Sequence, residues 1–189
     1  NDAEGVGLFR TEYIYISSKT LPTEEEQFEI YKEAIEKVDG KTIVFRTVDI
    51  GGDKQPPYLE HVPCINPSMG SRGIRFSMNN KELFKIQLRA LYRAAYYGED
   101  NVKVMYPMVC VPEEIDWVNE VNKEVEAELI HDKVNYKKPE QGVVIETPAS
   151  AMVADMIAPK VDFISIGTND LSQFLYAVDR MNSYIDMRD

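Results

Sequence analysis

The sequence is short of cysteine, of basic residues and of long apolar runs. It contains two cysteines, Cys64 and Cys110, too few for a disulfide framework or a zinc-binding pattern. We therefore expect two unpaired thiols in a cytoplasmic protein. No apolar run approaches the roughly 20 residues that a membrane-spanning helix needs, and no signal peptide opens the chain, so we expect no membrane association.

Positive charge is scarce as well. The chain of 189 residues has 21 Lys and Arg against 32 Asp and Glu, which gives a net charge of −11. Nucleic-acid-binding proteins usually present a basic face, so we expect no nucleic acid as a partner. An acidic chain repels anions as a whole, and an anion site in it would need a few arginines placed locally. We expect neither of the two histidines, His61 and His131, to be catalytic.

The sequence does contain a regular alternation of strand and helix patterns. Five apolar segments predict strands buried on both faces; they are Gly5–Arg10, Thr42–Thr47, Val102–Met108, Gly142–Glu146 and Phe163–Gly167. Helical patterns occupy about 23–38, 81–97, the stretch after Pro112, a short stretch after Pro148 and the stretch from about Asp170. Thr23 and Glu26 form a capping box that opens the first of these helices.

This alternation predicts an α/β fold with a parallel sheet and outer helices. Five strand–helix units fit either an open doubly wound sheet or part of a (β/α)8 TIM barrel. The chain is too short for a complete barrel, which takes about 250 residues. The segment Gly51–Asn80 is rich in Gly and Pro and is predicted to be a long loop insertion at the active-site mouth, without regular structure.

Charged residues follow the predicted strands. Because ligands of parallel α/β proteins bind at the carboxyl ends of the strands, we expect these side chains to surround one site; they are Arg10, Arg46, Glu146 and Asp170. Arginine binds phosphate and carboxylate oxygens through two hydrogen bonds, and paired carboxylates suit Mg²⁺. The pattern therefore predicts a site for a magnesium-bound anion. A structural ring of ion pairs remains an alternative, and Asn169 and Asp170 also fit the N-cap of the last helix.

Six segments resemble successive blocks of one known family; they are "EGVGLFRTEY", "RTVDIGGDK", "NPSMGSRGIR", "YPMV", "GVVIETPASA" and "FISIGTNDLSQFLYAVDRMN". In this order they resemble enzyme I of the bacterial phosphoenolpyruvate-dependent sugar phosphotransferase system. The resemblance covers nearly the whole chain, and "DIGGDK" together with "GTNDL" is specific to it. Pyruvate phosphate dikinase and phosphoenolpyruvate synthase share some of the blocks and give the alternative identification.

The resemblance implies one domain, residues 1–189, that is the phosphoenolpyruvate-binding TIM barrel of a cytoplasmic transferase. Glu146 and Asp170 would bind Mg²⁺. The residues that would bind phosphoenolpyruvate are Arg10, Arg46, Asn169, Arg180 and, with a weaker match, Arg72. The family transfers the phosphoryl group to a histidine in its own N-terminal part and then to a histidine-containing phosphocarrier protein, and it releases pyruvate.

Two parts of the family pattern are not found in the sequence. The phospho-histidine region would lie before the first residue, and the cysteine that acts as the acid belongs to a later block, so we assign that role to neither Cys64 nor Cys110. We expect a barrel truncated after about five βα units, a fragment that is inactive by itself. Its open sheet edge favours self-association, and the family's barrel is also its homodimer interface. A module that serves dimerisation alone is therefore the third hypothesis.

Overall fold

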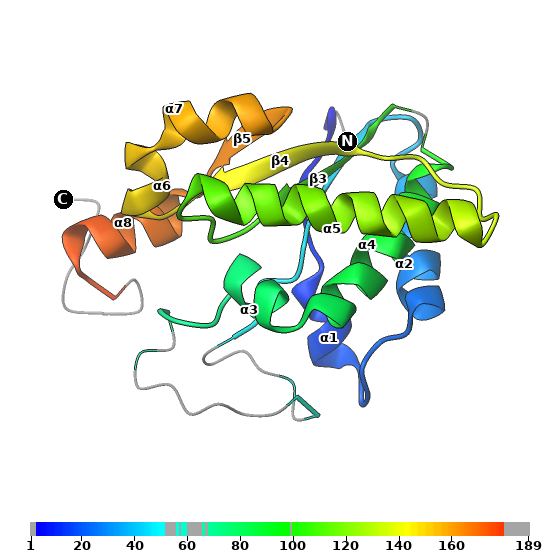
Figure 1. The fold of residues 1–189 in the computed structure, drawn as a ribbon, viewed down its shortest axis with the longest axis horizontal. Helices are drawn as coiled ribbons and strands as arrows, with labels where there is room; N and C mark the ends of the chain where they lie inside the picture. The colour runs from blue at the N-terminus through cyan, green and yellow to red at the C-terminus, as the bar shows by residue number, and fades with distance from the viewer. Residues whose placement is uncertain are drawn as a thin grey trace.

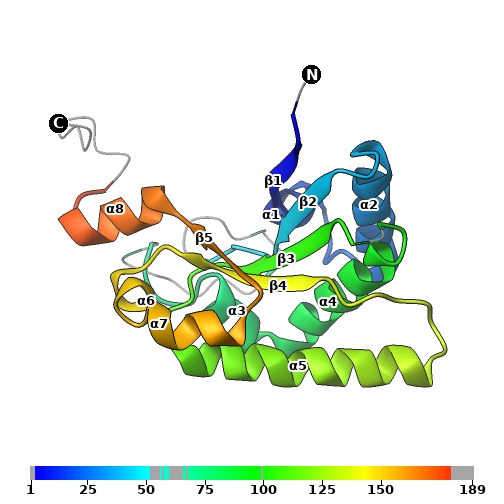
Figure 2. The same ribbon diagram turned by 90° about the horizontal axis from the view of Figure 1, so that it is seen from above.

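A computed structural model of the chain describes residues 3–51, 56, 58–59, 66, 68–98 and 100–179. Five parallel strands form one sheet in the order β1-β2-β3-β4-β5, and the sheet curls into a half-barrel with helices on its outer face (Figures 1 and 2). The strands are β1 (Gly5–Arg10), β2 (Thr42–Arg46), β3 (Val102–Tyr106), β4 (Glu140–Ile145) and β5 (Phe163–Ile166). The predicted α/β partial barrel of five units is confirmed.

The helices that the sequence predicted are all present. They are α2 (Glu24–Lys37), α4 (Lys81–Ala95), α5 (Pro112–His131), α6 (Pro148–Met152) and α8 (Thr168–Tyr176). The capping box of α2 is formed, because the Thr23 side chain accepts a hydrogen bond from the backbone N–H of Glu26 and the Glu26 carboxylate accepts one from the N–H of Thr23. None of the described helices is both long and apolar enough to span a membrane.

Four short elements were not predicted. They are α1 (Glu12–Ser17), α3 (Ile74–Asn79), α7 (Ala154–Ile157) and a 3₁₀ turn (Ala158–Lys160). Helix α3 corrects the expectation that residues 51–80 lack regular structure. Its Ile74 and Phe76 side chains are buried in the main core, and this burial stabilises a six-residue helix that local propensity alone would not. The other residues of that segment lie partly outside the described ranges.

The sheet has two faces with different partners. The outer face, with Ile43, Phe45 and Val104, packs against the helices in the main core. The inner face has a small apolar cluster of Val44, Met105 and Val144. Strands β2, β3 and β4 are largely buried on both faces, as predicted. Strands β1 and β5, at the two edges of the sheet, are partly exposed instead. The prediction was wrong for these two because, among the described residues, each has a neighbouring strand on one side only.

A β-bulge in β1 determines which side chains of that strand face inward. The register of β1 against β2 shifts between Val6 and Phe9, and both of these side chains pack on the outer core. In a regular strand two residues three positions apart point to opposite faces, so the extra residue is what allows both to face outward. Beyond the bulge, Arg10 pairs with Arg46 in register and lies on the inner face with it.

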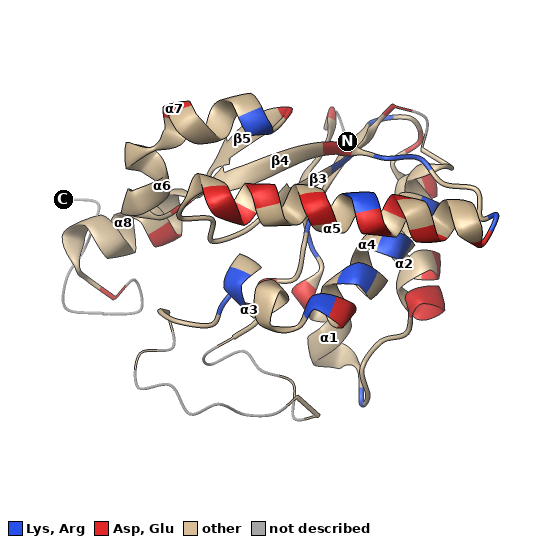
Figure 3. Cartoon of the chain, viewed as in Figure 1, with Lys and Arg blue, Asp and Glu red and all other residues tan. Residues whose placement is uncertain are grey.

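Charged side chains join the outer helices. Figure 3 shows acidic and basic residues side by side on α2, α4 and α5. Glu24 at the start of α2 bridges two arginines of α4, at 2.7 Å from Arg89 Nε and 2.8 Å from Arg93 Nη1. These ion pairs are partly exposed and lie away from the carboxyl ends of the strands, where the pocket of the next subsection is found.

Candidate functional site

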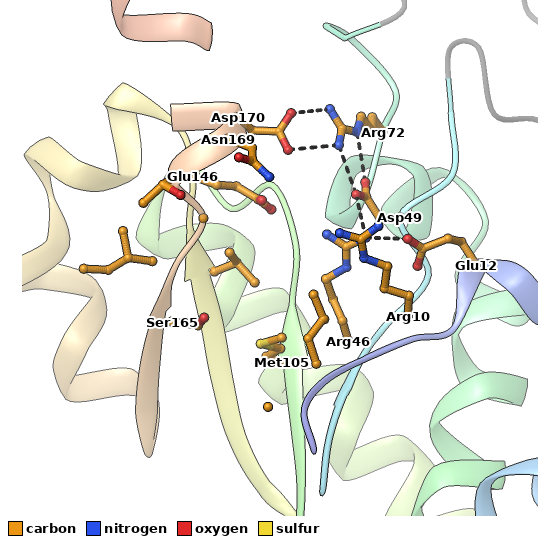
Figure 4. A pocket seen from close by; sticks show the side chains of 16 residues that line it. Arg10, Glu12, Arg46, Asp49, Arg72, Met105, Glu146, Ser165, Asn169 and Asp170 are labelled. Atoms are coloured by element: carbon orange, nitrogen blue, oxygen red, sulfur yellow. Dashed lines mark hydrogen bonds and ion pairs between the residues drawn. The ribbon is translucent and has the colours of Figure 1, made fainter. Parts of the chain in front are cut away.

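A pocket of about 210 Å³ lies at the carboxyl ends of the strands. Six of its charged or amide side chains come from predicted positions; they are Arg10, Arg46, Arg72, Glu146, Asn169 and Asp170. Figure 4 shows Arg10 and Arg46 on one side of the pocket, and Glu146, Asn169 and Asp170 on the other. The predicted convergence of residues far apart in sequence is therefore present. Arg180 lies outside the described residues.

The strand alternation places two of these charges. Arg46 comes two residues after Val44, and Glu146 comes two residues after Val144. Since side chains two residues apart share a face of a strand, both continue the inner face that the Val44 and Val144 cluster begins. The inner face is thus apolar at its middle and charged at its carboxyl end.

The two strand-end arginines differ in their partners. Arg46 is 8% exposed, and its Nη2 atom lies 2.6 Å from Glu12 Oε1 and 3.1 Å from Asp49 Oδ2. Its Nε atom is buried without a hydrogen-bond partner among the described residues. Arg10 is exposed and makes no ion pair within the described part of the chain. One arginine is therefore held by the protein, and the other is available to an anion.

Arg72 connects the two sides of the pocket. Its Nε and Nη2 atoms donate to the two carboxylate oxygens of Asp49, each at 3.0 Å, and its Nη1 atom donates to Asp170 Oδ1 at 2.9 Å. Burial by itself lowers the pKa of Arg72, but the charges and hydrogen bonds of the two aspartates raise it above the usual value. Arg72, which had the weaker match to the family pattern, is thus fully part of the site.

Together these contacts form a row of alternating charges across the mouth, in the order Glu12, Arg46, Asp49, Arg72 and Asp170. Every residue of the row is less than a tenth exposed. The alternative interpretation as a structural ring of ion pairs is therefore correct in part, because the row exists. It does not account for Arg10 or for Glu146, which do not belong to the row.

Glu146 is a buried carboxyl group whose negative charge is stabilised by few neighbouring groups. It is 2% exposed, and one oxygen accepts a hydrogen bond from the backbone N–H of Met108 at 2.7 Å. Burial raises the pKa of Glu146 to about 7, and the charges of Asp49 and Asp170 add to this, against the Met108 hydrogen bond and the charge of Arg46. A buried carboxylate of this kind is stabilised by a cation.

The backbone around Glu146 is unusually shaped. Met108, its hydrogen-bond donor, has φ of +60°, an uncommon conformation for a residue with a side chain, and such residues concentrate at functional sites. On the other side, a Cβ atom at Gly167 would lie 2.7 Å from Glu146 Oε2. Glycine at this position leaves the room that the carboxyl group occupies.

Helix α8 begins two residues before its predicted start. Its N-cap is Gly167, so Asn169 and Asp170 lie in the first turn and the N-cap interpretation of these two residues is wrong. The first turn of a helix is electropositive, which favours an acidic side chain there. Asn169 is exposed and Asp170 is buried.

Two acidic residues of the site were not among the predicted binding residues. Glu12 follows β1 by two positions, and Asp49 follows β2 by three, so the strand-end rule contained the signal for both. Gly51 has a structural role in the same region. It has φ of +138°, and a Cβ atom there would lie 2.2 Å from the backbone oxygen of Ser71, so it packs on the segment that holds Arg72.

The charge balance of the pocket indicates what it can bind. Three arginines and four carboxylates line it, which leaves one net negative charge when all the carboxylates are ionised. No cluster of three or more His, Cys, Asp or Glu side chains suited to a metal occurs among the described residues. Two carboxylates, Glu146 and Asp170, fit a hard divalent cation that takes its other oxygen ligands from water and from a bound anion.

Comparison with known proteins gives a consistent result. Residues 1–188 match the family model described as PEP-utilising enzyme, PEP-binding domain. The chain is 46% identical to the phosphoenolpyruvate-protein phosphotransferase of Priestia megaterium, 47% to that of Listeria monocytogenes and 46% to that of Bacillus subtilis, in each case over 98% of this chain. It spans about a third (32%) of the length of these relatives.

Proposed function

This chain belongs to the PEP-utilising enzymes and matches their PEP-binding domain, and on that premise we propose that it binds phosphoenolpyruvate as part of a phosphoenolpyruvate-protein phosphotransferase. In the whole protein the phosphoryl group would pass to a protein histidine, with release of pyruvate, as the first step of sugar uptake by the phosphotransferase system. The observation that carries the proposal is one pocket in which three arginines face two strand-end carboxylates.

The positively charged and amide side chains of the pocket would bind the anionic substrate. Arg10 and Arg46 would hold the phosphoryl oxygens, because planar guanidinium groups bind such oxygens through paired hydrogen bonds. Asn169 offers an amide from the opposite side of the pocket, and Arg72 adds a third cation. Arg180 is assigned to the same pocket from the family resemblance alone. As the phosphoryl group leaves, charge spreads over its oxygens, and fixed cations stabilise it without rearrangement.

Glu146 and Asp170 would hold the divalent cation, which we propose to be Mg²⁺. When bound, the cation neutralises charge on the oxygens of the substrate. With the pocket itself negative by one charge, we expect phosphoenolpyruvate to bind weakly without it. Asp170 already pairs with Arg72 at 2.9 Å. The guanidinium group of Arg72 and the divalent cation would therefore share this carboxylate, or one would replace the other on it.

The remaining parts of the proposal rest on the family. The partners are the phospho-histidine region and the histidine-containing phosphocarrier protein, and the location is the cytoplasm. Cys110 lines a separate cavity of about 260 Å³ with Met108 and Thr147, and Cys64 lies outside the described residues. Neither is assigned as the acid. The relatives named above are all phosphotransferases, which favours this activity over that of a dikinase or a phosphoenolpyruvate synthase.

Calorimetric titration of phosphoenolpyruvate tests the proposal. We expect binding to the wild type in Mg²⁺ and a loss of affinity of about 100-fold in Arg46→Ala, because two charge-assisted hydrogen bonds contribute roughly 1.5 kcal/mol or more each. Arg93→Ala is the control, since Arg93 is also paired with carboxylates and is mostly shielded from water but lies outside the pocket. Equal affinity in both variants would contradict the proposal.

Dimerisation is a second candidate function, favoured by the free edge of the sheet. Ile164 and Ile166 on β5 are 40% and 68% exposed, and apolar edge strands pair readily with other chains. We therefore expect sedimentation velocity to show a species heavier than the monomer. A single monomeric boundary at high protein concentration would contradict self-association and leave the binding function unaffected.

A further inference from the structure

Asp49 lies where the two inner-facing arginines of the row meet. Its Oδ2 atom is 3.1 Å from Arg46 Nη2, and its two oxygens are each 3.0 Å from Arg72. One carboxylate thus contacts guanidinium groups from two different segments, one at the end of β2 and one before α3. It is 4% exposed, and water competes little for these contacts.

The backbone that carries Asp49 is held on both sides. The N–H of Thr47 donates to the carbonyl oxygen of Met105 at 3.0 Å, and the N–H of Val48 donates to the Gln87 side chain at 2.9 Å. Val48 and Ile50, which flank Asp49, are fully buried. The carboxylate therefore projects from a fixed point, as a positioning group requires.

We propose that Asp49 is a positioning residue that fixes the separation and orientation of Arg46 and Arg72 for the oxygens of the anionic substrate. The proposal rests on the proposed function. Through its own charge an aspartate in an anion site opposes binding, so its presence there favours the anion only through the geometry that it imposes. Arginines already held in the binding arrangement lose less conformational entropy when the anion arrives.

Two effects of opposite sign make this testable. Asp49→Asn removes one negative charge from the pocket and keeps the shape of the side chain. If Asp49 acts only through the electric field, phosphoenolpyruvate in Mg²⁺ will bind more tightly to the variant. If Asp49 positions the arginines, the affinity will fall, and we expect a loss of tenfold or more. Glu12 and Asp170 still pair with Arg46 and Arg72 in the variant, which supports its folding.

Asp49→Glu separates charge from geometry. It keeps the charge and moves the carboxylate by one methylene group, so a positioning role predicts a loss of affinity and a field effect predicts none. Glu24→Gln is the control, because Glu24 also bridges two arginines at 2.7 and 2.8 Å but does so outside the pocket. It should leave the affinity within twofold of the wild type.

A measurement without ligand keeps the proposal separate from the proposed function. Nitrogen-15 NMR of the arginine side chains reports rotation of each guanidinium group about the Nε–Cζ bond. We expect rotation of Arg46 and Arg72 to be at least tenfold faster in Asp49→Asn than in the wild type. Unchanged rotation, or tighter binding of phosphoenolpyruvate, overturns the proposal. If the wild type does not bind phosphoenolpyruvate at all, the proposed function fails, and the rotation rates decide the role of Asp49.

Discussion

The Arg72→Ala variant will be less stable than the wild type by about 3–5 kcal/mol, the usual cost of removing one partner from a buried ion pair. Arg72 is the shared partner of Asp49 and Asp170, and both aspartates are at most 5% exposed. Without the guanidinium group, two buried carboxylates face each other with less positive charge nearby. Urea denaturation at pH 7.5, in the absence of divalent cations, measures the difference.

The same variant should respond strongly to Mg²⁺. A bound cation between Glu146 and Asp170 replaces part of the lost positive charge, so the cation should raise the unfolding midpoint of Arg72→Ala more than that of the wild type. Arg93→Ala, whose ion pairs are partly exposed, should lose no more than about 1 kcal/mol and show no such response. Similar losses in the two variants would mean that Arg72 is not a buried bridge.

The Glu146→Gln variant should be more stable than the wild type at pH 8. Burial raises the pKa of Glu146 from 4.5 to about 7, so the folded protein holds a proton that the unfolded chain releases at lower pH. This carboxyl therefore costs no stability below about pH 4.5, and the cost grows until the pH passes 7. At 1.36 kcal/mol for each pKa unit, we expect a gain of about 3 kcal/mol for glutamine at pH 8 and almost none at pH 4.5.

Denaturation of both proteins at several pH values tests this expectation. Glutamine keeps the oxygen that accepts from the Met108 N–H, so the charge is the main change. Glu114→Gln is the control, since Glu114 is also buried and also accepts backbone N–H groups but pairs with Arg75; it should lower stability. With saturating Mg²⁺ the order of Glu146→Gln and wild type should reverse. A pH-independent difference would show that Glu146 is not destabilised by its burial.

Much of this site followed from one rule about parallel sheets. The sequence indicates where each strand ends through apolar runs that stop at Arg10, Arg46 and Glu146, and the topology of the fold brings those ends together. The strands themselves needed only local information, because β-branched runs between helical patterns have few other interpretations. For this reason all five strands were found to within two residues at each end.

Features that depend on distant contacts did not follow from the sequence. Helix α3 is stabilised because its Ile74 and Phe76 side chains pack in the main core. The local sequence pattern does not show that these two residues contact that core. The Arg72 bridge joins residues up to 98 positions apart. The exposed faces of β1 and β5 likewise depend on which strands lie beside them, which local hydrophobicity does not encode.

The bulge in β1 adds a residue that the alternation of the strand does not need. Val6 and Phe9 both face the helices although they are three positions apart, because the extra residue is accommodated between them. Removing Gly7 or Leu8 would leave these two side chains two positions apart, as on a regular strand, so both would still face the helices and Arg10 would still face inward. The extra residue instead enlarges the wall of the pocket, since Gly7 and Leu8 both line it. Shortening the strand here would therefore change the lining of the pocket and leave the arginine on its face.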